Sequence, residues 1–196
     1  MAEAVDFLMN LPRISTRPWR ERRDYLACVA AVAASDGHLH KDEEALLDRW
    51  IEEFELPPKS REIVLAAAQQ VPEEELSRIE ARMASTDLVY SLMLDMMGMA
   101  MADGILMDDE IQMLQRVAVH LGVPQVHFNI LIEFVHAAHQ ASRLSSPEPL
   151  FEHSIMSAFE LMRKQGVNLF EHTLLCVASP EYDDFLKARW AVFRAS

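Results

Sequence analysis

Two short stretches of the chain carry the same pattern of residues. Residues 34–44 read ASDGHLHKDEE and residues 101–110 read MADGILMDDE. Both contain Asp-Gly-x-Leu-x-x-x-Glu, and the second copy lies 67 positions after the first. An Asp-Gly pair between two segments with helical spacing indicates a tight turn that joins one helix to the next. The fold must therefore accommodate the same helix-turn-helix unit twice.

The spacing of apolar residues predicts helices along the whole chain. Apolar residues recur with helical periodicity, and no alternating strand pattern persists. Four of the five glycines stand where a helical pattern stops, and most of the prolines stand where one starts. The expected helices span residues 3–10, 17–36, 41–55, 58–70, 73–84, 86–103, 108–121, 124–143, 148–165, 168–178 and 180–194.

The repeat is longer than the two turns. Residues 24–57 align with residues 91–124 without a gap. The first helix of each copy has a narrow face of small and polar residues, and small side chains let two helices approach closely. We therefore expect these two helices to cross at the centre of the domain, with Gly98 at the close contact. The residues of this face are Asp24, Cys28, Ala31 and Ser35 in the first copy and Ser91, Asp95, Gly98 and Ala102 in the second.

These patterns predict an all-α fold. Residues 1–143 are expected to form a helical bundle built from two duplicated helix-turn-helix hairpins. Residues 144–196 are expected to form a helical C-terminal extension, because the stretch RLSSPEP at 143–149 has the composition of a linker.

The repeated pattern partly matches an EF-hand calcium loop. Gly37 and Glu43 fall on the loop positions that require Gly and Glu. The first and third loop positions, however, are Val32 and Ala34, and the second copy has methionines there. Because these side chains have no oxygen ligands, a standard EF-hand is excluded.

Two interpretations of the acidic residues stay open. Glu43 and Glu110 each fall near the third position of a helix, where a carboxylate accepts hydrogen bonds from unpaired backbone N–H groups. Alternatively, four acids form sites for a divalent metal (Ca²⁺, Mg²⁺ or Zn²⁺) or for a basic partner surface. These four acids are Asp36, Glu43, Asp103 and Glu110.

Composition and charge narrow the class of protein. A net charge of −13 argues against nucleic-acid binding, which needs a basic surface. An apolar start interrupted by Asp6 is unlike a signal peptide, and the longest apolar stretch, residues 88–102, is too short to cross a membrane. We therefore expect a cytoplasmic protein without a transmembrane segment.

Arginines gather near the start of the chain. We expect them to be solvated, with contact to anionic lipid at the membrane surface or to the acidic body of the same fold as alternatives. They are Arg13, Arg17, Arg20, Arg22 and Arg23.

The stretches AVAASDGHLHKDEEALLDRW and MAMADGILMDDEIQMLQRVA resemble the hallmark of the TerB-like tellurite-resistance family. That family includes the cytosolic N-terminal domain of the membrane-anchored DjlA co-chaperones. The resemblance covers about residues 20–143 and implies an all-helical duplicated bundle. It also implies acidic residues near the two turns, possible divalent-metal binding, a protein partner, and a role in stress response or protein assembly without catalysis. Asp42 and Asp109 are adjacent acids at equivalent places in the two copies.

A competing hypothesis is a metalloenzyme. Glu133 and His136 form a Glu-x-x-His pair with His139 one turn further on, although a di-iron bundle needs two such pairs and two more glutamates. No nucleophile motif or phosphate-binding loop accompanies them. We therefore expect no enzymatic activity.

The end of the chain carries large apolar residues, Trp190 and Phe193 among them. A helix with these residues is expected to dock on the bundle or to lie in the groove of a partner protein. The oligomeric state does not follow from the sequence.

Overall fold

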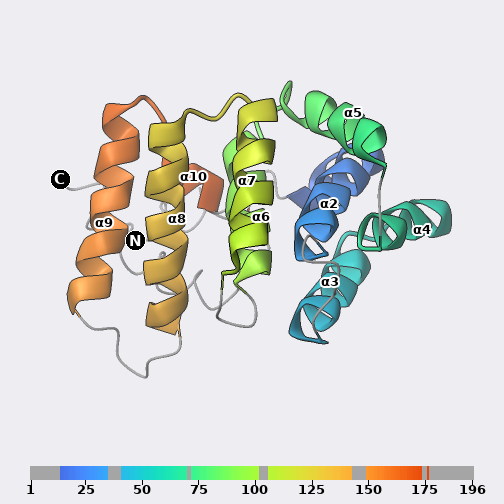
Figure 1. Cartoon of the computed structure of the whole chain (residues 1–196), viewed down its shortest axis with the longest axis horizontal. Coiled ribbons are helices and arrows are strands. Elements are labelled where there is room, and N and C mark those ends of the chain that lie inside the picture. The colour runs from blue at the N-terminus through green and yellow to red at the C-terminus, as the bar shows by residue number, and fades with distance from the viewer. Residues whose placement is uncertain are drawn as a thin grey trace.

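The structure is a computed structural model that describes residues 14–34, 41–69, 72–101, 106–142, 149–173 and Cys176. Every regular element in these ranges is a helix, so the all-α prediction is confirmed (Figure 1). The elements are η1 (Ile14–Thr16), α2 (Trp19–Ala33), α3 (Lys41–Glu53), α4 (Pro58–Ala67), α5 (Glu73–Met83), α6 (Val89–Ala100), α7 (Asp108–His120), α8 (Gln125–Ser142), α9 (Pro149–Lys164) and α10 (Leu169–Thr173).

The ends of the helices follow the backbone preferences of proline and glycine. Pro57 and Pro72 stand at the N-caps of α4 and α5, where the missing N–H group of proline costs no hydrogen bond. Gly122 and Gly166 follow α7 and α9 with φ angles of 73° and 82°. This left-handed region is open to glycine without steric cost, which explains why these two helices end there.

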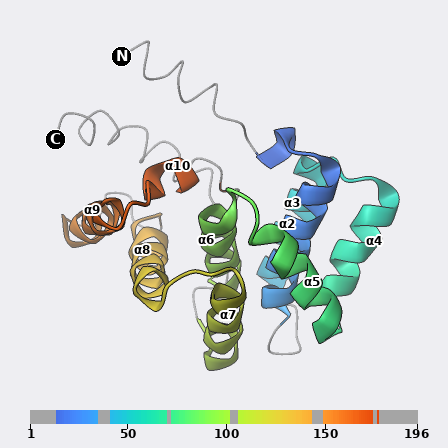
Figure 2. The ribbon, with the colours of Figure 1, turned by 90° about the horizontal axis from the view of Figure 1, so that it is seen from above.

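The centre of the fold is formed by α2 and α6, which pack against each other as expected. Helices α3, α4 and α5 gather around α2, while α8 and α9 lie on the other side of α6 (Figures 1 and 2). Every residue of α2 from Asp24 to Ala33 is buried, as is every residue of α6 from Ser91 to Met97. A helix that is covered on most sides must carry mostly apolar side chains, which accounts for the methionine-rich sequence of α6.

The two predicted hairpins have matching bounds. Helix α7 begins and ends 67 positions after α3, from 41 to 108 and from 53 to 120, and α6 ends 67 positions after α2, from 33 to 100. Each second helix also contacts the first helix of the other hairpin, because α3 touches α6 and α7 touches α2. That the hairpins arose by duplication, and that Gly98 marks the closest approach, stay predictions.

The predicted C-terminal extension contributes helices that pack on the bundle. Helix α9 lies along α8, and the short helix α10 contacts both α9 and α6 (Figure 2). The core is therefore continuous from α2 to α10. The division at residue 143 stays a prediction, and Trp190 and Phe193 lie outside the described residues. Within the described part of the chain, no helix combines the length and apolar character needed to cross a membrane.

Candidate functional site

Helix α7 begins with an acidic turn in which one carboxylate is buried. Glu110 is the third residue of α7 and is only 6% exposed. Its Oε2 accepts a hydrogen bond from the backbone N–H of Met107, the N-cap residue, at 2.7 Å. The predicted capping role of Glu110 is therefore confirmed. The two acids before it, Asp108 and Asp109, are exposed to solvent.

Glu43 occupies the same position in α3. It is the third residue of that helix and is 2% exposed. A carboxylate is almost never buried unless the fold compensates its charge. Its placement at a helix N-terminus supplies part of that compensation, because the helix dipole is positive there.

Several predicted site residues fall outside what the structure describes. Asp36 and Asp103 belong to this group, together with the glycines that follow them. Asp42 lies in α3, but its side chain is not described. The structure therefore places Glu43, Glu110 and Asp109, and leaves the predicted set of four acids as a prediction.

The alternative site lies on α8. Glu133 and His136 are exposed there, and His139 is half-buried. Among the described residues, no three His, Cys, Asp or Glu side chains are grouped so that they could hold a metal ion. The described geometry gives no support to a metal centre built from these three residues.

A buried acid of the narrow polar face predicted on α2 joins this helix to α5. Asp24 accepts hydrogen bonds from Arg23 on Oδ1, at 2.6 and 2.9 Å, and from Arg82 on Oδ2, at 2.6 Å. The bond to Asp24 raises the pKa of the Arg82 guanidinium above its ordinary value. Helices α2 and α5 are thus fastened by one carboxylate held between two arginines.

A second buried acid joins α5 to α7. Glu80 is fully buried, with Oε2 at 2.5 Å from Nδ1 of His120 and Oε1 at 3.4 Å from Nη2 of Arg116. The apolar periodicity of α5 already indicates that Glu80 is buried, because it lies on the same face as Ile79 and Met83. Both partners lie on α7, which no local pattern could reveal.

A third buried acid lies between the two central helices. The Tyr25 hydroxyl donates a 2.6 Å hydrogen bond to Oδ2 of Asp95, and both side chains are fully buried. Burial, followed by the charge of Asp95, raises the pKa of Tyr25 well above its ordinary value, so Tyr25 remains a donor. Burial and the same carboxylate raise the pKa of Cys176, which disfavours a reactive thiolate.

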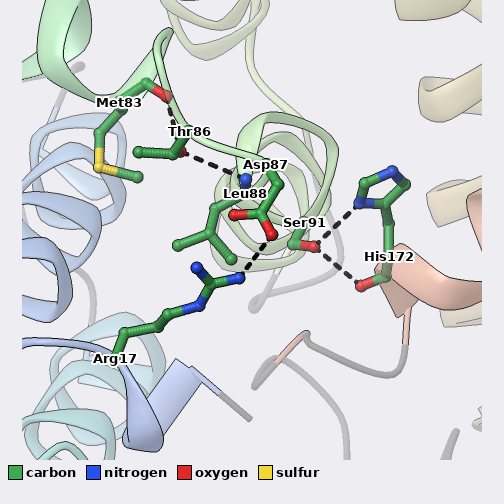
Figure 3. Close-up of polar contacts among 7 residues, drawn as sticks. All are labelled: Arg17, Met83, Thr86, Asp87, Leu88, Ser91 and His172. Atoms are coloured by element: carbon green, nitrogen blue, oxygen red, sulfur yellow. Dashed lines mark hydrogen bonds and ion pairs between the residues drawn. The ribbon is translucent and has the colours of Figure 1, made fainter. Parts of the chain in front are cut away.

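Helix α10 is held against α6 by polar contacts (Figure 3). The buried Ser91 hydroxyl lies 3.1 Å from the carbonyl oxygen of His172, to which it donates, and 3.4 Å from Nδ1 of the same residue. The contact with the ring nitrogen is long, and the hydroxyl has no exposed surface. These features describe a docking contact and not an activated nucleophile.

Aromatic contacts extend this junction to α8. The Tyr90 hydroxyl forms a 2.7 Å hydrogen bond with Nδ1 of His127. The centroids of the Tyr90 and His172 rings are 5.2 Å apart. Burial lowers the pKa of both histidines below the ordinary value of 6.5. Both rings therefore favour the neutral form in the folded protein.

The stability of the protein is expected to fall as the pH drops below 6.5. In the unfolded chain His127 and His172 take up protons at their ordinary pKa of 6.5, whereas the folded state resists protonation. Because the unfolded state then binds more protons, the free energy of unfolding decreases in this window. The charges of Asp87 and Glu171 near His172 oppose the effect but do not reverse it.

Urea unfolding at a series of pH values measures the slope of the free energy of unfolding against pH. His127→Gln and His172→Gln should each flatten it, while His136→Gln, which replaces an exposed histidine of α8, should leave it unchanged. If the slope is the same in the wild type and in all three variants, His127 and His172 do not cause the pH dependence.

Three of the described arginines near the start of the chain are bound within the fold, and Arg13 lies outside the described residues. Arg17 pairs with Asp87 at 2.6 Å (Figure 3), Arg22 donates to the carbonyl oxygen of Phe54, and Arg23 pairs with Asp24. The expectation of solvated side chains is wrong for these three arginines. Contact with the acidic body of the fold, the alternative, is correct for Arg17 and Arg23.

The fold and these contacts define an all-helical protein whose helices are joined by buried polar pairs and whose helices α3 and α7 open with acidic turns. The family model described as Tellurite resistance protein TerB matches residues 27–131, from within α2 to within α8. This match spans more than half of the chain, so the chain belongs to the TerB family of tellurite-resistance proteins. No curated protein and no solved structure matched the chain.

Proposed function

We propose that this chain is a non-catalytic binding module of the cytoplasm that acts in a stress response of the tellurite-resistance type or in protein assembly. Membership of the TerB family supports the class of process. The described polar clusters support a role without catalysis, because their buried acids are engaged in joining helices. A group held in this way is a structural element and is poorly placed for turnover of a substrate.

The observation that carries the proposal is the pair of equivalent acidic corners. At the start of α3 and of α7, a buried glutamate at the third position is accompanied by an exposed acid, Glu44 in α3 and Asp109 in α7. The sequence places Asp36 and Asp103 seven residues before these glutamates, at the same two turns. Carboxylate oxygens grouped at a turn are the ligands that hard divalent cations prefer.

The module is accordingly proposed to respond to a divalent cation at these corners. The cation would neutralise acids that otherwise repel one another, and it would change the surface that each hairpin offers to a partner protein. Binding of a basic protein surface by the same acids, without a metal, is the alternative outcome.

Calorimetric titration of the full-length chain with Ca²⁺, Mg²⁺ and Zn²⁺ tests the metal. The informative variants are Asp36→Asn with Asp103→Asn, and Glu110→Gln, whose amide oxygen can still accept the Met107 N–H. The matched control is Asp48→Asn with Glu52→Gln, which neutralises two exposed acids elsewhere on α3. We expect saturable binding that both corner variants weaken and the control retains.

Absence of saturable binding in the wild type, or equal loss in the control, would contradict the metal-responsive site. The cellular role has a separate test, in which cells lacking this chain are challenged with tellurite. Restored growth with the control and not with the Asp36→Asn, Asp103→Asn variant would support the proposed role of the corners. Growth that does not depend on the chain at all would reject a tellurite-resistance role.

A further inference from the structure

The first residue of α2 is a tryptophan that the fold leaves partly in solvent. Trp19 is 40% exposed, and two guanidinium groups lie over its ring. The distances from the ring centroid to Cζ are 5.3 Å for Arg20 and 5.6 Å for Arg23, which places both within the range of cation–π contacts. The indole is thus held in place by its neighbours but is not covered by the core.

The row of guanidinium groups continues onto α5. Arg23 and Arg82 bind the two different oxygens of the Asp24 carboxylate, so their side chains meet at that acid. Two arginines therefore stand over the Trp19 ring, and a third, Arg82, meets one of them at a buried carboxylate. We call this set, Trp19, Arg20, Arg23 and Arg82, the Trp19 patch.

The patch retains unused hydrogen-bond donors. Arg82 uses only its Nε on Asp24, and its side chain is 52% exposed. Arg20 is exposed, and within the described part of the chain no hydrogen bond or ion pair involves it. Two neighbouring arginines differ, because Arg17, just before α2, and Arg22, in its first turn, are bound to the body of the fold. Among the described arginines of residues 17–23, the guanidinium of Arg20 is therefore the one left to a partner, and Arg82 adds the donors that Asp24 does not use.

The charge of the whole chain selects the kind of partner. With a net charge of −13, the protein as a whole repels an extended polyanion such as an anionic membrane or a nucleic acid. A short acidic segment of a partner protein interacts mainly with the charges of the patch itself, because charges beyond the Debye length of about 8 Å are screened at physiological salt. Trp and Arg are also the residue types enriched at the energetic centres of protein interfaces.

We propose that the Trp19 patch is a docking surface for an acidic segment of a partner protein. An apolar side chain of the segment covers the Trp19 ring, and its carboxylates pair with the free donors of Arg20 and Arg82. This inference goes beyond the proposed function, because it concerns a second surface with the opposite charge to the acidic corners.

Nuclear magnetic resonance titration of the full-length chain can detect such weak, local binding. The probe is a peptide of alternating leucine and glutamate, and the same peptide with glutamine in place of glutamate tests the need for charge. Phosphatidylserine vesicles test the membrane alternative. We expect the acidic peptide to shift the indole N–H signal of Trp19 and the backbone signals around Arg20 and Arg82, with no such shifts from the glutamine peptide.

Two variants test the patch against a matched control. Trp19→Ala and Arg20→Glu change exposed side chains and should each weaken binding of the acidic peptide about tenfold, as for a residue at the energetic centre of an interface. Lys164→Glu makes the same change of charge on α9, at the opposite end of the molecule (Figures 1 and 2), and should change the affinity less than about twofold.

The proposal is overturned if the acidic peptide causes no shifts at the patch, or if the glutamine peptide binds equally well. It is also overturned if Lys164→Glu weakens binding as much as Arg20→Glu, because the effect would then reflect net charge alone. Binding to the vesicles without binding to the peptide would assign the patch to the membrane instead.

Discussion

Replacing both Arg116 and His120 by alanine is expected to lower the free energy of unfolding by about 3 kcal/mol, because it leaves the buried Glu80 carboxylate without its partners. The effect is large because Glu80 has no exposed surface and its charge cannot be hydrated without opening the junction between α5 and α7. Urea unfolding followed by circular dichroism measures the change.

The same substitutions can be rescued if the charge is the cause. Adding Glu80→Leu to the double variant removes the stranded carboxylate and should recover a large part of the lost stability. The control is Arg78→Ala, which breaks a pair with Glu74 in which both side chains are mostly exposed, and it should have little effect. Failure of Glu80→Leu to recover any stability would show that lost packing, and not lost charge pairing, explains the result.

Replacing Tyr25 by phenylalanine is expected to cost about 2 kcal/mol, the usual range for a hydrogen bond to a buried charged group. The ring volume is almost unchanged, so packing of the ring against Phe54 is retained and the cost isolates the hydroxyl. Thermal and urea unfolding of the single variant measure it.

A double-mutant cycle with Asp95→Asn assigns this cost to the pair. If the carboxylate is what makes the hydroxyl important, Tyr25→Phe should cost less when the acceptor is a neutral amide. An equal cost in both backgrounds would mean that Tyr25 stabilises the protein independently of Asp95. Tyr90→Phe, which removes a half-buried hydroxyl bonded to His127, gives a second comparison with a hydrogen-bond partner that is not a carboxylate.

Local patterns in the sequence were sufficient for the approximate bounds of the described helices and for the capping role of Glu110. The helices expected at residues 3–10 and 180–194 lie outside the described residues. Apolar spacing predicted α3 at residues 41–55, and the structure has it at Lys41–Glu53. The spacing from Gly104 to Glu110 likewise predicted a carboxylate at the third helical position, where it caps α7. Both features depend on residues within one or two helical turns, which is the range over which backbone preferences act.

The polar clusters were not predictable in the same way. Tyr25 and Asp95 are 70 positions apart, as are Arg17 and Asp87, and nothing in either local sequence names the partner. The sequence did place Asp95 on the narrow face of α6 that was expected to meet α2, but it did not identify Tyr25, which is not among the residues of the matching face of α2, as its partner. Arg17 and Arg22 were misjudged for the same reason, because their partners, Asp87 and the carbonyl oxygen of Phe54, lie far along the chain.

The arrangement of polar groups on α6 has a consequence for how the core is specified. Apolar side chains surround this helix, and burial alone would allow it to rotate about its own axis among several well-packed orientations. Asp95 and Ser91 remove that freedom. Only one rotation of α6 about its axis lets Asp95 accept from Tyr25 while Ser91 donates to His172. The polar contacts thus select a single orientation from those that hydrophobicity would accept.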